Sequence, residues 1–107
     1  MINRTFFTSI ASGGTVSDAF SIGNAREFGI WAPLLTTCSA FLLAAYDPSS
    51  PANFIRVTDD ALVGDWAWPV NSGGKAAQVS PALFPHYKIE TSAAQADTRT
   101  FAIHVKL

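Results

Sequence analysis

The C-terminal stretch of the chain, residues 81–107, reads PALFPHYKIETSAAQADTRTFAIHVKL and decides the fold class. Its last nine residues alternate, and one parity carries the apolar side chains of Phe101, Ile103, Val105 and Leu107. Residues 87–91 alternate in the same way, and a period of two is the signature of a half-buried β-strand. The loop between them, Ser92–Thr98, is long enough to reverse the chain and is rich in turn-compatible residues. We therefore expect an antiparallel pair that closes the fold.

The rest of the chain predicts further short strands separated by turns. Turn signals rich in Gly, Pro, Asn and Asp recur about every ten residues. Residues 40–46 are apolar on both parities, which predicts a central strand covered on both sides. The sequence therefore predicts an all-β fold: a single antiparallel β-sandwich, jelly-roll-like, with about eight strands in one domain over residues 1–107. The expected strands upstream of the closing pair are residues 4–10, 16–22, 26–32, 40–46, 53–58, 64–70 and 76–79, and Pro81–Pro85 is expected to make a tight helical turn.

The composition describes a chain with a weakly charged surface. Of its 107 residues, 49% are hydrophobic and only 14% charged, and the formal net charge is -1. This suits either a protein packed against neighbouring subunits or a plain sandwich with a Ser/Thr-rich exterior. Lysines and arginines are scattered singly, so nucleic-acid binding is not expected. The single cysteine, Cys38, rules out an internal disulfide and is expected to be a buried, inert thiol.

One uncharged stretch, residues 28–46, approaches the length of a membrane span. Pro33 interrupts it early, and the polar segment Thr36–Ser39 lies at its centre. Two buried strands joined by a loop explain the stretch better than a membrane helix, so no membrane association is expected. The N-terminus also lacks the continuous apolar region of a signal peptide, because Arg4 is followed by Thr-Phe-Phe-Thr-Ser.

Two tryptophans form the most conspicuous candidate contact site. Trp66 and Trp68 are two residues apart and are followed by Pro69, so on a strand both indoles would point the same way. Exposed, they can stack on a sugar ring or contact another protein; buried, they belong to the core. Both alternatives remain open at this level.

No residue pattern in the chain predicts catalysis or a metal site. If the closing pair is in register, His86 lies opposite His104, but no cysteine or further ligand completes a metal set. Four acidic residues in predicted loops are potential calcium ligands, but they lack the regular spacing of a calcium-binding loop. They are Asp47, Asp59, Asp60 and Asp65. We therefore expect no catalytic residue, no metal and no cofactor.

Several short motifs resemble a group of small β-sandwich proteins encoded among the virion genes of tailed bacteriophages and related prophages. The matching segments are Ser12-Gly13, Gly29-Ile30-Trp31-Ala32-Pro33, Phe41–Asp47, Pro81-Ala82-Leu83-Phe84, Tyr87-Lys88-Ile89, Gln95-Ala96-Asp97-Thr98-Arg99 and Phe101–Leu107. The chain departs from the shared plan at residues 48–51 and 66–69, where we expect a partner-specific surface.

This resemblance implies a non-enzymatic virion component, assembled in the host cytoplasm as a capsid decoration or cement subunit. Its partners would be the major capsid protein, other virion proteins or neighbouring copies in a homo-oligomer, with residues 1–5 as a contact arm. The matched residues have structural roles under this interpretation. Pro81, Leu83 and Phe84 would plug one end of the sandwich, Phe101 and Ile103 would fill the core, and Asp97 would order the last turn. Arg99 is expected to pair with Glu90 across the closing hairpin.

Two other functions remain as alternatives to the decoration subunit. One is a carbohydrate-binding module of a phage tail or spike, with Trp66 and Trp68 as its stacking platform. The other is a small hydrolase on a jelly roll, which would need a pocket that gathers His86 or His104 with the loop aspartates. The residues support the hydrolase least.

Overall fold

The computed structural model describes residues 4–36, 38–59, 64–65, 67–70, 75–80 and 82–106. Within them the chain forms short strands and one turn of 3₁₀ helix, η1 (Pro51–Asn53). The strands are β1 (Arg4–Ile10), β2 (Phe20–Ser21), β3 (Glu27–Ala32), β4 (Cys38–Ala45), β5 (Ile55–Arg56), β6 (Thr58–Asp59), β7 (Gly64–Asp65), β8 (Ala67–Val70), β9 (Lys75–Val79), β10 (His86–Thr91) and β11 (Arg99–Lys106).

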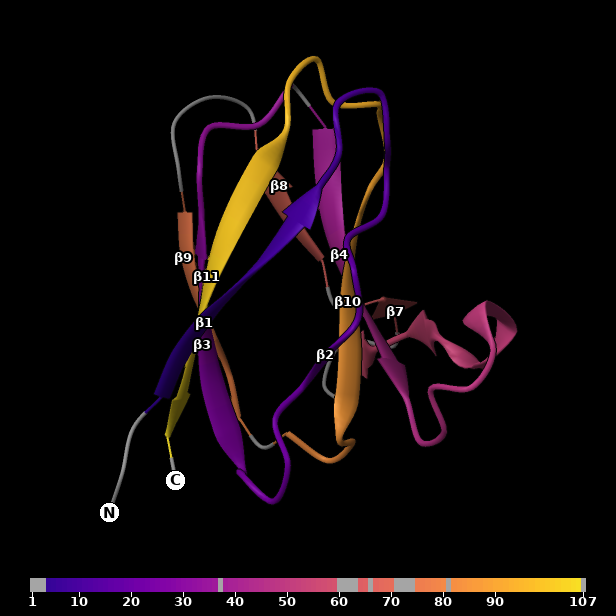
Figure 1. Cartoon of the computed structure of the whole chain (residues 1–107), viewed down its shortest axis with the longest axis vertical. Coiled ribbons are helices and arrows are strands. Elements are labelled where there is room, and N and C mark those ends of the chain that lie inside the picture. The colour runs from indigo at the N-terminus through magenta and orange to yellow at the C-terminus, as the bar shows by residue number, and fades with distance from the viewer. Residues whose placement is uncertain are drawn as a thin grey trace.

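Two antiparallel sheets face each other and confirm the predicted β-sandwich (Figure 1). Sheet A has the order β1-β11-β3-β9, and sheet B has the order β2-β10-β4, with β8 and β5 both paired to the outer edge of β4. If β1, β2, β3, β4, β8, β9, β10 and β11 are numbered one to eight, the sheets run 1-8-3-6 and 2-7-4-5. This is the jelly-roll order, in which successive strands alternate between the two sheets except for the fourth and fifth, β4 and β8, which pair with each other in sheet B. Strands β6 and β7 pair only with each other among the described residues.

The expected closing hairpin is wrong, because β10 and β11 lie in different sheets. Strand β10 pairs with β4 over six residues, and β11 lies between β1 and β3 in the opposite sheet. The connection, residues 92–98, therefore crosses from one sheet to the other. It is fastened to the β1–β2 loop, where the Gly13 N–H donates to the Gln95 carbonyl at 2.7 Å. Alternation revealed which faces are buried, but it did not reveal the partner of each strand.

The ion pair expected between Arg99 and Glu90 is wrong for the same reason. Glu90 faces outward from sheet B and accepts from Arg56 at 3.0 Å. The Arg99 guanidinium lies at the far end of sheet A, where it donates to Thr36 Oγ1 at 3.2 Å. Of the expected N-terminal contact segment, residues 1–5, Arg4 and Thr5 belong to β1, opposite Val105 and His104, and residues 1–3 lie outside the described part.

Three other segments differ from their predicted structure. Only Phe20–Ser21 is a strand within residues 16–22, because the buried Ser17 hydroxyl accepts from the Ile89 N–H at 2.9 Å and interrupts the ladder. The strand expected over 53–58 is split between β5 and β6, and η1 precedes it. The expected helical turn at 81–85 is absent from its described part, residues 82–85. There the N–H of Phe84 donates to the Tyr87 hydroxyl at 3.2 Å.

The core between the sheets is built around four aromatic side chains. Phe28 lies 4.9 Å from Tyr87 and 5.7 Å from Phe20 between ring centroids, and Phe6 packs on Phe20 at 5.9 Å. These rings come from β1, β2, β3 and β10, so they join both sheets. Aliphatic residues from both sheets fill the remainder of the core, notably Ile10, Ile30, Leu42, Ile89, Ile103 and Val105.

Burial of Tyr87 makes the stability of the folded domain depend on pH. Desolvation raises the pKa of its phenol above the ordinary value near 10. The folded state favours the neutral phenol of Tyr87. Its contribution to the free energy of unfolding is therefore complete below the pKa that Tyr87 has in the unfolded chain, and it is lost as the pH rises through the raised pKa of the folded state.

We therefore expect stability to fall as the pH is raised above about 10, and Tyr87→Phe to reduce that fall. Urea midpoints at pH 7 to 11 would measure it. Tyr46, which is exposed, supplies the control: Tyr46→Phe should leave the alkaline loss in place. An equal loss in wild type and Tyr87→Phe would contradict the assignment.

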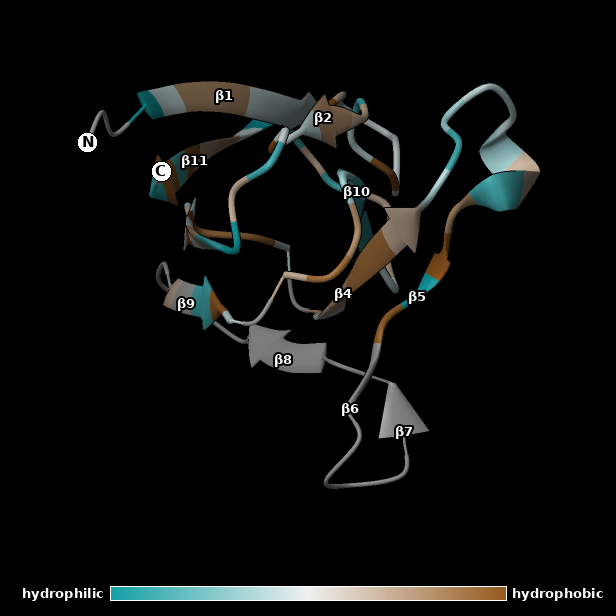
Figure 2. Ribbon diagram, turned by 90° about the horizontal axis from the view of Figure 1, so that it is seen from below, coloured by the Kyte–Doolittle hydropathy of each residue, from teal (hydrophilic) through white to brown (hydrophobic). Residues whose placement is uncertain are grey.

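The outer face of sheet B is covered by the arm, which we define as residues 46–57. Phe54 packs with Leu43 and Ala45 in a second small core, and Lys88 Nζ lies 4.5 Å above the Phe54 ring. The Arg56 guanidinium lies 3.8 Å above Phe41. This cover explains why β4 is apolar on both parities, as expected of a central strand; Figure 2 shows its hydrophobic character. Figure 1 shows the arm beside the sandwich.

Within the described residues, no helix is long and apolar enough to cross a membrane. The uncharged stretch 28–46 instead forms β3 and β4, one in each sheet.

Candidate interaction surfaces

An aromatic row crosses the outer face of sheet A. The register places Phe7 opposite Ala102, Ala102 opposite Trp31, and Trp31 opposite Ala76. All four belong to the outward parity of their strands. Phe7 is 68% exposed and Trp31 is 57% exposed, although both are large apolar side chains. The row therefore presents two aromatic rings on either side of a small residue, Ala102.

Polar side chains flank the aromatic row on both sides. On one side, Thr5 Oγ1 lies 2.7 Å from His104 Nδ1. The register continues this polar line of residues to Gly29 on β3 and Gln78 on β9. On the other side, the hydroxyls of Ser9 and Thr100 are 3.0 Å apart. Lys106 and Glu27 form an ion pair at 3.3 Å beyond the first polar row.

A second exposed apolar surface lies at one end of sheet B. We call it the end patch: Tyr46, Ile55, Leu83 and Phe84. Tyr46 follows β4 and Leu83-Phe84 precede β10, and Ala45 pairs with His86, so both segments leave the sheet at the same end. Ile55 pairs with the neighbouring Ala44. The four side chains are between 43% and 82% exposed.

At the opposite end, the buried amide of Gln95 joins its own loop, residues 92–98, to the β3–β4 connection. Its Oε1 accepts from the Thr36 N–H at 2.9 Å and its Nε2 donates to the Ala93 carbonyl at 3.0 Å, although the residue is only 1% exposed. Nε2 also contacts Cys38 Sγ at 3.7 Å. Burial raises the pKa of the Cys38 thiol, which favours its protonated form. This cluster is structural, since its polar groups are already paired.

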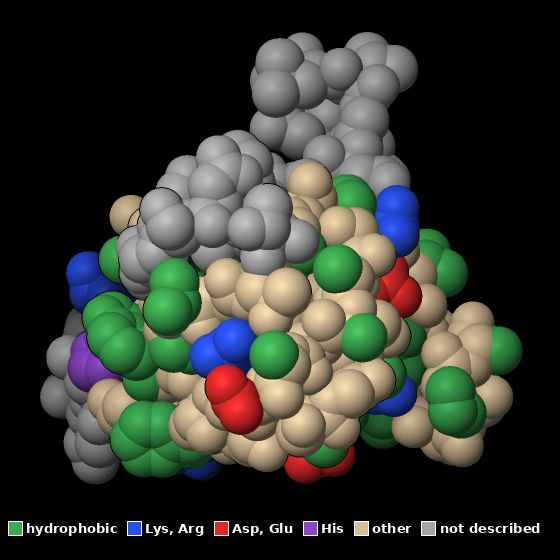
Figure 3. All heavy atoms as spheres, turned by 90° about the horizontal axis from the view of Figure 1, so that it is seen from above, with side chains coloured by type: hydrophobic (Ala, Val, Ile, Leu, Met, Phe, Trp, Pro, Cys, Tyr) green, Lys and Arg blue, Asp and Glu red, His purple; other side chains and the backbone are tan. Residues whose placement is uncertain are grey.

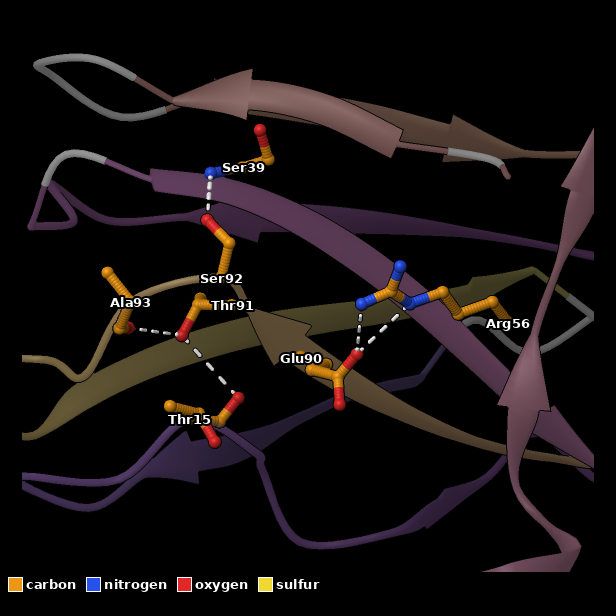
Figure 4. A network of polar contacts seen from close by, with 7 residues as sticks. All are labelled: Thr15, Ser39, Arg56, Glu90, Thr91, Ser92 and Ala93. Carbon is orange, nitrogen blue, oxygen red and sulfur yellow. Dashed lines mark hydrogen bonds and ion pairs between the residues drawn. The ribbon is translucent and has the colours of Figure 1, made fainter. Parts of the chain in front are cut away.

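A further polar network joins the ends of β4 and β10 (Figure 4). Ser92 Oγ accepts from the Ser39 N–H at 2.9 Å, and the Thr91 hydroxyl donates to the Ala93 carbonyl at 2.9 Å. Figure 4 also shows Arg56 directed at the Glu90 carboxylate, which is on the outer face of sheet B. The hydrogen bonds of Ser92 and Thr91 tie the loop ends of β4 and β10 together.

The residues predicted as contact sites fall partly outside the described structure. Trp66 is not described, and neither are the side chains of Trp68 and Pro69, whose backbone in β8 pairs with Ala40 and Ser39. The platform proposed for the two tryptophans thus lies outside what the structure describes.

The residues predicted to be structural divide into two groups. Phe101 and Ile103 are fully buried in the core. Pro81 is not described, and Leu83 and Phe84 are exposed, so they do not plug the sandwich. Ala82 packs against the core in their place. Asp97 is exposed, and the ordering role expected of it belongs to the neighbouring Gln95, whose amide is buried between the loops.

The pairing of the two histidines is wrong. His86 lies in sheet B opposite Ala45 and Ser21, whereas His104 lies on the outer face of sheet A.

Asp47 caps the start of the arm by accepting from the Ser49 N–H at 2.9 Å, and this hydrogen bond lowers its pKa. Across the described parts of the chain, no three His, Cys, Asp or Glu residues gather where they could hold a metal.

Sequence reasoning missed the aromatic row, although a signal was present. Trp31 shares its parity with Glu27 and Gly29 rather than with the apolar Phe28 and Ile30. Phe7 likewise shares its parity with Thr5 and Ser9. An aromatic side chain on the polar parity of a strand predicts an exposed ring, and the two rings meet because β1 and β3 flank β11.

Comparisons with known proteins identify the fold. No protein-family model matches the chain, and no curated protein matches it. The crystal structure of the SPBc2 prophage-derived protein YomS matches with a TM-score of 0.60 at 13% identity, over 98% of this chain and 95% of that chain. A structure of Bacillus endospore appendages that form disulfide-linked pili gives a TM-score of 0.48 at 11% identity, over 99% and 88% of the two chains. The chain therefore shares its β-sandwich fold with YomS.

Proposed function

We propose that the protein is a non-enzymatic structural subunit of a phage virion, which decorates or cements the capsid shell. It binds the major shell protein or neighbouring virion proteins in many copies, and the end patch forms the contact. The location is the virion itself, assembled in the host cytoplasm.

The observation that carries this proposal is the end patch. Tyr46, Ile55, Leu83 and Phe84 are large apolar side chains, and monomeric soluble proteins rarely leave such residues gathered in one exposed area. Two of them, Tyr46 and Ile55, lie on either side of residues 48–51, where the chain departs from the plan of the phage proteins it resembles. A departure beside the patch suits recognition of a particular shell.

Charge and chemistry support the same function. Only 14% of the residues are charged, and Figure 3 shows lysines, arginines and acids scattered over one face rather than gathered. A weakly charged exterior suits a subunit packed among others. Among the described residues, no three His, Cys, Asp or Glu side chains lie where they could hold a metal ion, so nothing there favours a metal-dependent hydrolase. The prophage origin of YomS, which has the same fold, agrees with a phage source.

Binding of variants to shell particles tests the contact surface. Purified protein would be sedimented with particles of the encoding phage that lack this subunit. We expect the double variant Leu83→Ser/Phe84→Ser to bind at least tenfold more weakly than wild type. Phe7→Ser, equally apolar and exposed but on sheet A, is the matched control and should bind normally.

Two results would count against the end patch. If the double variant binds as tightly as wild type, the contact lies elsewhere. If Phe7→Ser weakens binding as much as the double variant, the outer face of sheet A is the shell contact instead.

A further inference from the structure

We propose that the aromatic row on the outer face of sheet A binds an uncharged glycan, with sugar rings stacked on Phe7 and Trp31. This inference goes beyond the proposed attachment to a shell and uses a different surface. It also differs in its residues from the tryptophan platform that the sequence suggested.

The spacing of the two rings favours an elongated ligand that lies across the strands. Phe7 and Trp31 are on β1 and β3, which flank β11, so they are two strand spacings apart, roughly 9.6 Å. Ala102 separates them and leaves the space above β11 open. Because only the small side chain of Ala102 lies between the two aromatic rings, each ring can stack on one sugar unit of the same oligosaccharide.

The groups beside the rings match the edges of a sugar. Each pyranose has an apolar face of C–H groups and a rim of hydroxyls, so it needs an aromatic surface with hydrogen-bonding groups at its sides. Thr5 and His104 supply an alcohol and an imidazole on one side. Ser9 and Thr100 supply two hydroxyls on the other. The ligand would exchange these side-chain pairs for bonds to its own hydroxyls.

The charge on this face favours a neutral ligand. Among the described residues that face outward from sheet A, the fixed charges are those of Lys106 and Glu27, which neutralise each other at 3.3 Å. Gln78 Nε2 donates to the same Glu27 carboxylate at 3.1 Å. Among these described residues, an anionic polysaccharide would meet no unpaired fixed cation, and a cationic partner would meet no unpaired carboxylate.

The apolar area favours a glycan over a second protein. An aromatic side chain offers about 150–250 Å² for burial, so two partly exposed rings supply a few hundred Å². A stable protein interface covers about 800 Å² on each partner. Beyond Phe7 and Trp31, the outward residues of the face are small or polar: Thr5, Ser9, Glu27, Gly29, Ala76, Gln78, Thr100, Ala102, His104 and Lys106.

Glycan binding by matched variants tests the proposal. Wild-type protein would be applied to an array of neutral and anionic oligosaccharides and bacterial polysaccharides, and affinities for the bound glycans would be measured by titration calorimetry. We expect wild type to bind neutral glycans, and Phe7→Ala and Trp31→Ala each to weaken binding at least tenfold. Trp31→Phe keeps a stacking ring and should stay within about threefold of wild type. Tyr46→Ala removes an exposed aromatic ring from the end patch and should bind normally.

The results that would overturn glycan binding differ from the results that would overturn the shell contact. The proposal is overturned if wild type binds no neutral glycan, if it binds only anionic ones, or if Tyr46→Ala loses binding as strongly as Trp31→Ala. A concentration-dependent dimer that Phe7→Ala and Trp31→Ala abolish, without glycan binding, would assign the face to a second copy. Shell binding by Phe7→Ala and Trp31→Ala should remain normal whichever result is obtained.

Discussion

Replacing Phe28 by alanine is expected to lower the free energy of unfolding by about 3–5 kcal/mol, the range for removing a large aromatic side chain from a core. The ring is 1% exposed and contacts both Tyr87 and Phe20, so its loss opens a cavity where β2, β3 and β10 meet. Urea denaturation followed by circular dichroism would measure the change. This loss is a large share of the stability of a small domain, since such domains are stable by only about 5–15 kcal/mol.

Phe7→Ala is the matched control for this prediction. It removes the same side chain from the outer face of sheet A, where most of the ring is in water. We expect a change within about 0.5 kcal/mol. If the two variants lost equal stability, the assignment of Phe28 to the core and Phe7 to the surface would be wrong.

Replacing Gln95 by alanine is expected to lower the free energy of unfolding by about 2–3 kcal/mol. The substitution leaves the Thr36 N–H without its side-chain acceptor and removes one of the two side-chain donors to the Ala93 carbonyl. It also uncovers Cys38, which Gln95 contacts. We therefore expect faster reaction of the Cys38 thiol with an alkylating reagent under native conditions, in addition to the lower urea midpoint.

Gln78 provides the comparison for the Gln95 substitution. It is the same residue type on an exposed position of β9, bonded to Glu27. Gln78→Ala should change stability by less than about 0.5 kcal/mol and leave the Cys38 reaction rate unchanged. Equal effects of the two substitutions would show that Gln95 does not hold the loops together.

The sequence predicted the layers of this fold better than its connections. The alternation in residues 4–10 and 99–106 was sufficient to place β1 and β11, because a period of two directly reflects one buried and one exposed face. It carries no information on which strand lies alongside. The prediction of a closing hairpin was wrong at this step, because a loop with the composition of residues 92–98 can either reverse the chain or cross between the sheets. The crossing depends on long-range contacts, the pairing of β11 with β1 and β3 and the bond from Gly13 to Gln95.

The interaction surfaces were harder to predict than the core. Leu83 and Phe84 are apolar and follow a proline, so burial was the reasonable expectation, yet both are exposed. Hydrophobicity alone cannot distinguish a core residue from a contact residue. Trp31 could have been identified from its parity, but its relation to Phe7 depends on β11 lying between their strands, which is a property of the topology.

The saturation stoichiometry of binding to shell particles tests the central claim most directly. Increasing amounts of wild-type protein would be added to particles of the encoding phage that lack it, and the bound copies counted after sedimentation. A decorating subunit should saturate at a fixed ratio to the shell protein. Absence of binding, or binding that rises without saturation, would contradict a role in the virion shell.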